Sequence, residues 1–261
     1  MKFLRDILNK QKPLFEKGGK FEKFYYLFEA GETFMFVPNE VTQKKGSQIR
    51  DAIDLKRLMM TVVIAMIPCL LFGIWNVGHQ HFFALGQEAT FIDKIIVGSR
   101  QVLPIVLVSY IAGGFVEVIF STIRRHPINE GFLVTGMLIP LVMPPHIPLW
   151  QVALATIFAI LIAKEVFGGT GFNVFNPALM ARAFIFFAYP AHISGDRVWS
   201  VDGISQATPL LEKSNMLVDK GIIISSSDYA WLDMFYGLIP GSIGETSTLA
   251  ILIGATILLV T

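Results

Sequence analysis

The stretch from residue 55 to residue 76 reads LKRLMMTVVIAMIPCLLFGIWN. It is about as long as the roughly 20 apolar residues that a helix needs to cross a bilayer. Only 16% of the 261 residues are charged, whereas a soluble domain has about 25%. We therefore predict an all-α polytopic membrane protein, folded as a helical bundle.

Further apolar segments follow at about 102–123, 131–143, 149–167, 178–189 and 229–240, and another begins near residue 246. That final segment reaches residue 261 without a polar stop, so we expect more helices beyond it. Gly- or Pro-rich breaks interrupt the pattern at 168–177 and 240–247. Broken helices are tolerated in membranes where they line a buried site or a water-filled path. The two breaks predict an inverted repeat with one broken element in each half.

The distribution of charge predicts the orientation. Twelve of the 21 basic residues lie before residue 58, so we expect residues 1–54 to be a cytoplasmic segment ahead of a membrane domain over 55–261. Alternation then places loops 77–100 and 190–228 outside and the glycine-rich turn 168–176 inside. The second of these loops has three basic and five acidic residues, as suits an outside loop.

Glu117 lies inside the second apolar segment. A carboxylate at membrane depth costs at least about 2.5 kcal/mol, so it is a candidate functional residue. Either it pairs with a neighbouring polar group, or it serves a Na+ or proton pathway, because hard cations prefer oxygen ligands. Gly113 and Gly114 precede it, and they permit either close helix packing or the approach of a flat ring.

Other polar residues have more local explanations. Asn176 before Pro177 is a typical helix N-cap. Lys164 and Glu165 are expected to form local contacts at the cytoplasmic rim, and Glu130 and Glu245 to compensate helix ends. Arg182 needs a carboxylate or carbonyl partner that the sequence does not identify. We expect no metal site, since the spacing of His79 and His81 in an outside loop is a weak signal.

Four motifs together are specific. They are DGISQAT at 202–208, HPINEGF at 126–132, KEVFGGTG at 164–171 with NPA at 176–178, and the segment from Gly241 to Ala250. From about residue 50 onward, the chain resembles the B subunits of the Na+-translocating NADH:quinone oxidoreductase (Nqr) family. The first motif differs from the family pattern at Gln206, where glycine is usual.

The resemblance implies FMN esterified to Thr208, in a motif with Asp202 and Ser205, and a noncovalent riboflavin near Asn173 and Asn176. It also implies a quinone, either ubiquinone or menaquinone, near Gly113 and Gly114, with electrons passing from FMN through riboflavin to the quinone while Na+ is translocated. No residue of this chain is expected to be catalytic in itself, and NADH is expected to bind elsewhere in the complex, because the glycines at 168–171 do not follow a βαβ pattern.

The implied partners are the other Nqr subunits, a flavin transferase and membrane lipid, with no nucleic acid. The implied location is the bacterial inner membrane, with the N-terminus cytoplasmic and Thr208 extracytoplasmic. Two alternatives remain: the homologous D subunit of an Rnf ferredoxin:NAD+ complex, and a passive transporter or channel, for which broken helices are equally typical.

Overall fold

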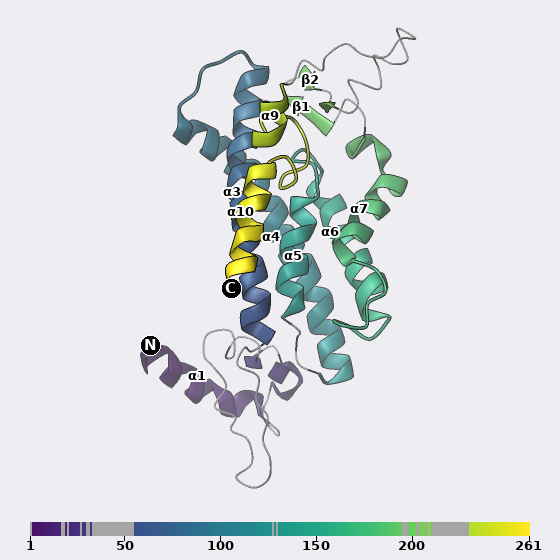
Figure 1. The fold of residues 1–261 in the computed structure, drawn as a ribbon. Coiled ribbons are helices and arrows are strands. Elements are labelled where there is room, and N and C mark those ends of the chain that lie inside the picture. The colour runs from purple at the N-terminus through teal and green to yellow at the C-terminus, as the bar shows by residue number, and fades with distance from the viewer. Residues whose placement is uncertain are drawn as a thin grey trace.

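The structure is a computed structural model. It describes residues 2–16, 19, 21–26, 28–29, 32, 55–126, 128, 130–194, 198–201, 204–206, 208–209 and 230–261. Its principal helices run side by side in an elongated bundle, with α1 at one end and a small β hairpin at the other (Figure 1). The predicted all-α membrane class is confirmed, although the hairpin was not foreseen.

The membrane body begins with two long helices, α3 (Leu55–Ala84) and α4 (Phe91–Arg124). Both are long and apolar enough to cross a membrane. The shorter elements α5 (Gly131–Leu141), α6 (Leu149–Phe158), α7 (Pro177–Ala188) and α10 (Thr248–Val260) pack against them or one another. The remaining elements are α1 (Lys2–Phe15), η1 (Glu22–Phe24), η2 (Ala159–Glu165), η3 (Pro190–His192), β1 (Trp199–Val201), β2 (Ile204–Gln206) and α9 (Trp231–Tyr236).

The predicted outside loop at 77–100 is wrong. Both helices continue into it and leave only residues 85–90 between them, so His79 and His81 lie on α3. The polar residues stay helical because they find partners: His79 stacks on Trp75 and contacts Lys94 at 3.2 Å. Thr90 then starts α4 with a reciprocal capping box, which satisfies backbone donors at the helix start.

Glycines bring α3 and α4 into backbone contact. A Cβ at Gly78 would lie 1.8 Å from the carbonyl oxygen of Lys94, and a Cβ at Gly98 would lie 1.8 Å from that of Ile74. No other residue fits at such a distance, and small residues are the usual means of close helix packing in membranes. The pairing of the two longest helices therefore depends on these glycines.

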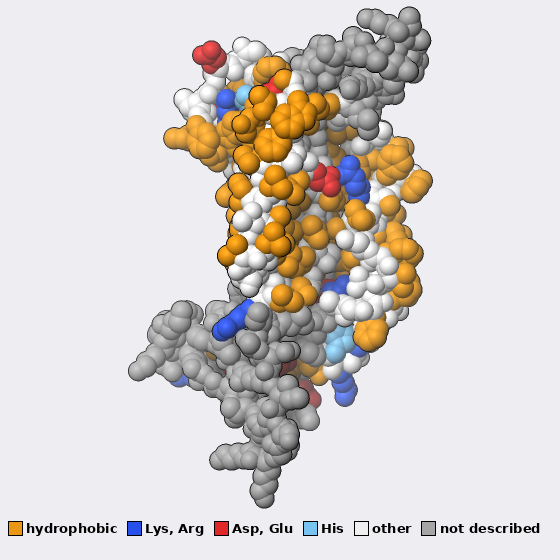
Figure 2. Space-filling view, in the orientation of Figure 1, with side chains coloured by type: hydrophobic (Ala, Val, Ile, Leu, Met, Phe, Trp, Pro, Cys, Tyr) orange, Lys and Arg blue, Asp and Glu red, His pale blue; other side chains and the backbone are white. Residues whose placement is uncertain are grey.

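One face of α4 has the exposed apolar surface of a lipid-facing helix. Large apolar side chains recur every fourth residue along it and are exposed: Leu103, Leu107, Ile111, Phe115, Ile119 and Ile123. A helix presents residues four apart on one side, so these form a continuous outward stripe. Figure 2 shows hydrophobic side chains over the middle of the bundle in the same way. An aqueous surface would leave this stripe exposed to water, whereas a bilayer covers it.

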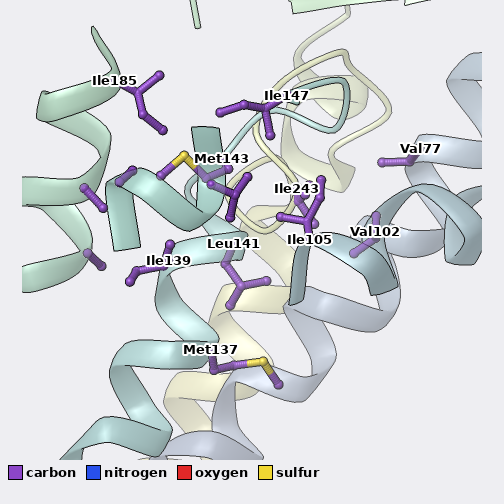
Figure 3. Close-up of a cluster of buried hydrophobic side chains, with 14 of the residues drawn as sticks. Val77, Val102, Ile105, Met137, Ile139, Leu141, Met143, Ile147, Ile185 and Ile243 are labelled. Carbon is purple, nitrogen blue, oxygen red and sulfur yellow. The ribbon is translucent and has the colours of Figure 1, made fainter. Parts of the chain in front are cut away.

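The main core lies between α3, α4, α5, α7 and the turn before α10. Val77, Ile105, Leu141, Ile185 and Ile243 from these elements are buried in one cluster (Figure 3). The cluster joins parts of the chain that are far apart in sequence, and it holds the two breaks described next in place.

Both predicted breaks are present. In the first, α6 changes into the π-helical segment η2 and ends in the glycine-rich turn. In the second, the turn before α10 runs against the end of α5, where Ile243 N donates to Met143 O at 3.0 Å and Gly244 N to Leu141 O at 2.8 Å. These hydrogen bonds pair backbone groups that lipid could not hydrogen-bond. The inverted repeat that the breaks suggest stays a prediction.

The predicted cytoplasmic segment is described only in part. Within it, Phe15 stacks on Phe28 with ring centroids 4.7 Å apart, and Lys12 pairs with Glu32 at 3.1 Å. Phe15 and Phe28 thus make a contact within the segment itself. Its boundary with the membrane domain and its cytoplasmic location stay predictions.

Candidate functional site

Glu117 lies on the inward face of α4 and is ion-paired. Its carboxylate accepts a hydrogen bond from Lys164 Nζ, and only 2% and 3% of the two side chains are exposed. The sequence left open whether Glu117 pairs with a neighbour or serves an ion pathway. The structure shows the pair, and the partner comes from 47 residues away.

The π-helical segment η2 explains how that partner arrives. Here the backbone bonds reach five residues back, as in Val166 N to Leu161 O and Gly169 N to Lys164 O, both at 3.0 Å. The wider turn leaves consecutive residues buried together: Lys164 contacts Glu117, while Glu165 pairs with Arg124 at 3.4 Å. The prediction that Lys164 and Glu165 form local contacts at the rim is therefore wrong. π segments are rare and are frequent at functional sites.

A cavity of about 310 Å³ opens beside these pairs. Its lining includes three acidic residues, Glu117, Glu130 and Glu165, and it is completed by His126, Ile128, Gly168, Gly169, Thr170 and Phe172. Thr170 Oγ1 is buried in this region and has no hydrogen-bond partner among the described residues. Oxygen-rich walls of this kind suit hydrated cations. Glu130 also starts α5, but its side chain makes no capping bond there.

The glycine pair before Glu117 divides into two roles. A Cβ at Gly113 would lie 2.5 Å from the Phe132 ring and 2.6 Å from Ile160, so this glycine is required for packing. A Cβ at Gly114 would meet Phe132 only at 3.7 Å, an ordinary contact. Of the two glycines, only Gly114 leaves room for a further atom beside Phe132.

The glycine-rich turn leads from the cavity to α7. Gly168, Gly169 and Gly171 have φ of 120°, 97° and 94°, a region that other residues rarely adopt. Asn173 accepts from Gly171 N at 3.2 Å and donates to Phe175 O at 3.1 Å, so its exposed amide has a defined orientation.

Asn176 caps α7 as predicted. Its side chain accepts from Ala178 N at 2.9 Å and from Leu179 N at 3.4 Å, and Pro177 occupies the first helical position. Around the two asparagines, Phe172, Val174 and Phe175 are exposed. Two amides and an apolar aromatic surface thus share one outward turn.

Thr208 follows the β hairpin by two residues and is half-buried. The strands β1 and β2 pair antiparallel, with Ser205 opposite Ser200 and Val201 opposite Ile204. Asp202 and the side chain of Ser205 lie outside the described part. The strand ends leave only Asp202-Gly203 between them, and Asp-Gly is a strong hairpin signal. That signal could have predicted the hairpin.

Trp199 fixes the hairpin to the membrane body. It is 1% exposed, its indole N–H donates to Gly241 O at 2.9 Å, and its ring meets His146 edge-on at 5.8 Å. His146 in turn contacts Gln101 at 3.1 Å. Burial lowers the pKa of His146, and neighbouring His81 lowers that pKa further. The threonine is therefore carried by a short hairpin with a buried anchor.

Arg182 on α7 finds both partners that it needs. Its guanidinium donates to Val142 O at the end of α5 and pairs with Glu245 at 3.2 Å. Glu245 also accepts from Ser242 at 2.5 Å. The expected role of Glu245 at a helix end is thus replaced by an ion pair, and Ser247 caps α10 instead.

The candidate residues fall into two groups, one at each end of α7. The asparagines and the acidic cavity lie at its start, and the hairpin with Thr208 follows its end. A helix of 12 residues spans about 18 Å. The amides and Thr208 are therefore separate sites, while Glu117, Gly113 and Gly114 share the region of Phe132.

Comparison with known proteins agrees with the motifs. The family model described as NQR2, RnfD, RnfE family matches residues 42–261. The B subunit of the Na(+)-translocating NADH-quinone reductase of Stutzerimonas stutzeri (strain A1501) is 48% identical over 98% of this chain and 68% of its own length. The B subunits of the same reductase from Ectopseudomonas mendocina (strain ymp) and Chromohalobacter salexigens are 47% and 46% identical, each over 99% of this chain and over 69% and 67% of their own lengths.

Proposed function

The chain belongs to the NQR2, RnfD, RnfE family, and on that premise we propose that it is the membrane subunit of a redox-driven sodium pump, the B subunit of a bacterial Na+-translocating NADH–quinone reductase. The observation that carries this function is the identity of nearly half the residues, over almost the whole chain, with proteins of that name. The other subunits of the complex are its partners.

The Na+ pathway of the proposal runs through Glu117 and the acidic cavity. A single carboxylate inside a membrane helix is costly, and here two buried carboxylates, Glu117 and Glu165, line one space. Both have cationic partners, Lys164 and Arg124. A cation entering between them would find oxygen ligands in a low dielectric, where attraction is stronger than in water.

The flavins of the proposal occupy the two ends of α7. Thr208 offers a hydroxyl directly after an anchored hairpin, which fits a phosphoester to FMN, and Ser205 and Asp202 belong to the same motif. Asn173 and Asn176 offer amides beside the exposed Phe172 and Phe175, which fits a riboflavin. Bound there, the flavins would supply the redox chemistry. A flavin transferase is the partner that Thr208 would require.

The quinone of the proposal approaches the backbone at Gly114. This position is favoured over Gly113, whose space the Phe132 ring already fills. The position is one turn from Glu117, so that electron acceptance and the ion pathway would meet on α4. The N-terminus is proposed to be cytoplasmic and Thr208 extracytoplasmic, which agrees with α1 and the hairpin lying at opposite ends of the bundle (Figure 1).

The D subunit of an Rnf complex is the nearest alternative, since the family description includes RnfD. The relatives compared above are all named as B subunits of the sodium-translocating reductase, and the match to them covers 98–99% of this chain, so it includes most of the first 40 residues as well. This favours the sodium-pumping reductase. A passive channel of similar fold is disfavoured for the same reason.

The experiment that tests the proposal detects covalent flavin. The complex is expressed with its flavin transferase, denatured and run on a gel, and the fluorescence of this chain is recorded. We expect fluorescence in the natural protein and none in Thr208→Val, which keeps the shape of the side chain and removes the hydroxyl.

Ser200→Ala is the matched control, because it removes a hydroxyl from the same hairpin, opposite Ser205 and outside the 202–208 motif. Its fluorescence should persist. A Thr208→Val variant that still fluoresces would place the flavin elsewhere, and a natural protein without covalent fluorescence would overturn the flavin assignment altogether.

A further inference from the structure

The buried pair of Lys164 and Glu117 is a costly way to hold two helices together. Both charges are almost fully removed from water, and replacing such a pair with apolar residues is often neutral or stabilising. Stability therefore does not account for it. The pair also joins α4 to η2, the one described segment with π-helical bonding over several residues.

Glu117 faces two environments. One side of its carboxylate receives the Lys164 ammonium, and the residue also lines the acidic cavity. Lys164 itself is the residue before Glu165, whose carboxylate lines the same cavity. A lysine side chain is flexible and carries a compact charge. The neighbouring Glu165, which pairs with Arg124, contributes a second acidic residue to the same cavity.

We propose that Lys164 is a tethered counter-ion that competes with Na+ for Glu117. Without Na+, its ammonium neutralises the carboxylate. When Na+ enters the cavity and binds Glu117, the ammonium moves to the cavity side, toward Glu165, and it returns when Na+ leaves. Glu117 is thus never left uncompensated in the interior. Lys164 is a positioning residue, and the inference rests on the proposed Na+ pathway through Glu117.

The proposed competition predicts the direction in which the Na+ affinity should change. Removing the ammonium removes the competitor, so Na+ should bind Glu117 more tightly. We expect the Na+ concentration for half-maximal activity to fall on the order of tenfold in Lys164→Met, within the range usual for coupling between two ligands. Maximal turnover should fall as well, because no ammonium returns to help release Na+. A residue that only supported the fold would lower the yield and leave the half-saturating Na+ concentration unchanged.

The test measures quinone reduction by the assembled complex in membranes, titrated with Na+ at constant ionic strength. Arg182→Gln is the matched control, since it removes a cation that is paired with Glu245, a carboxylate outside this cavity. The proposal expects a lower half-saturating Na+ concentration in Lys164→Met and no change in Arg182→Gln. An unchanged or higher value in Lys164→Met would overturn it, and so would an equal decrease in both variants, which would indicate general electrostatics.

A second comparison separates this inference from the proposed function and does not depend on Lys164→Met assembling. Glu117→Gln alone should alter the Na+ dependence, and adding Lys164→Met to it should change that dependence no further. If Glu117→Gln leaves the Na+ dependence as it was, the proposed pathway fails. If Glu117→Gln alters it and the two substitutions act additively, the pathway stands and the counter-ion role of Lys164 is rejected.

Discussion

At the scale of single residues, the buried charge on α4 is neutralised by a residue from a distant part of the chain. The carboxylate of Glu117 was conspicuous in the sequence, but Lys164 was assigned to the rim. Lys164 lies in the π-helical segment η2 and reaches Glu117 from there. Each charge therefore depends on the other for its place in the interior.

The pair predicts a strong penalty for removing one member. Glu117→Leu should lower the free energy of unfolding by about 3 kcal/mol, since the Lys164 ammonium loses its partner and Glu165, toward which it could turn, is already paired with Arg124. Glu117→Leu combined with Lys164→Met should recover most of that loss, because both charges are gone. Thermal unfolding in detergent measures the difference. A single variant as stable as the natural protein would show that the ammonium finds another partner.

The two glycines on α4 predict opposite effects of one methyl group. Gly113→Ala should be destabilising by about 1–3 kcal/mol, because it overpacks the contact with Phe132. Gly114→Ala should be stabilising by about 0.5–1 kcal/mol, because it restrains the unfolded chain and has room in the folded one. Unfolding midpoints of the two variants test this.

Quinone kinetics complete the comparison of the glycines. With quinone at Gly114, Gly114→Ala should raise the KM for quinone in the assembled complex even though the fold is more stable. A normal KM in that variant would remove Gly114 from the quinone site.

At the scale of elements, η2 decides the chemistry of the cavity. The segment 149–167 was predicted as one span, and the structure has α6 and η2 together over 149–165. The pattern of apolar residues did not indicate that α6 changes to a π helix at Ala159. Lys164 and Glu165 are both buried within this π segment.

At the scale of the whole molecule, the hairpin with Thr208 is attached through Trp199 to the turns before α6 and α10. His146 belongs to this attachment, and its lowered pKa makes the contact sensitive to acid. When folding lowers the pKa of a group, the folded protein becomes less stable as the pH falls below the unfolded-state pKa of that group, which is about 6.5 for histidine.

The natural protein should therefore lose stability between about pH 6.5 and the lower pKa of folded His146. His146→Gln cannot titrate there, so its unfolding midpoint should fall less over the same range. Unfolding midpoints at a series of pH values compare the two. Parallel curves would show that His146 does not contribute to the acid sensitivity.

Some of this protein follows from local sequence alone. The membrane class and the approximate spans follow from the length and apolarity of each segment, and the N-cap at Asn176 follows from its neighbours. Each of these features depends on residues within one element, so the local sequence is enough to predict it. The Asp-Gly between the two strands could have predicted the hairpin in the same way, but this signal was overlooked.

The polar pairs that build the candidate site required the tertiary structure. Arg124 with Glu165, Lys164 with Glu117 and Arg182 with Glu245 join residues 41, 47 and 63 positions apart. Which charges meet depends on how each helix is rotated about its axis and on where a π turn shifts that rotation. The sequence by itself determined that charges lie within the membrane body, and only the packing of the helices decided which of them neutralise one another.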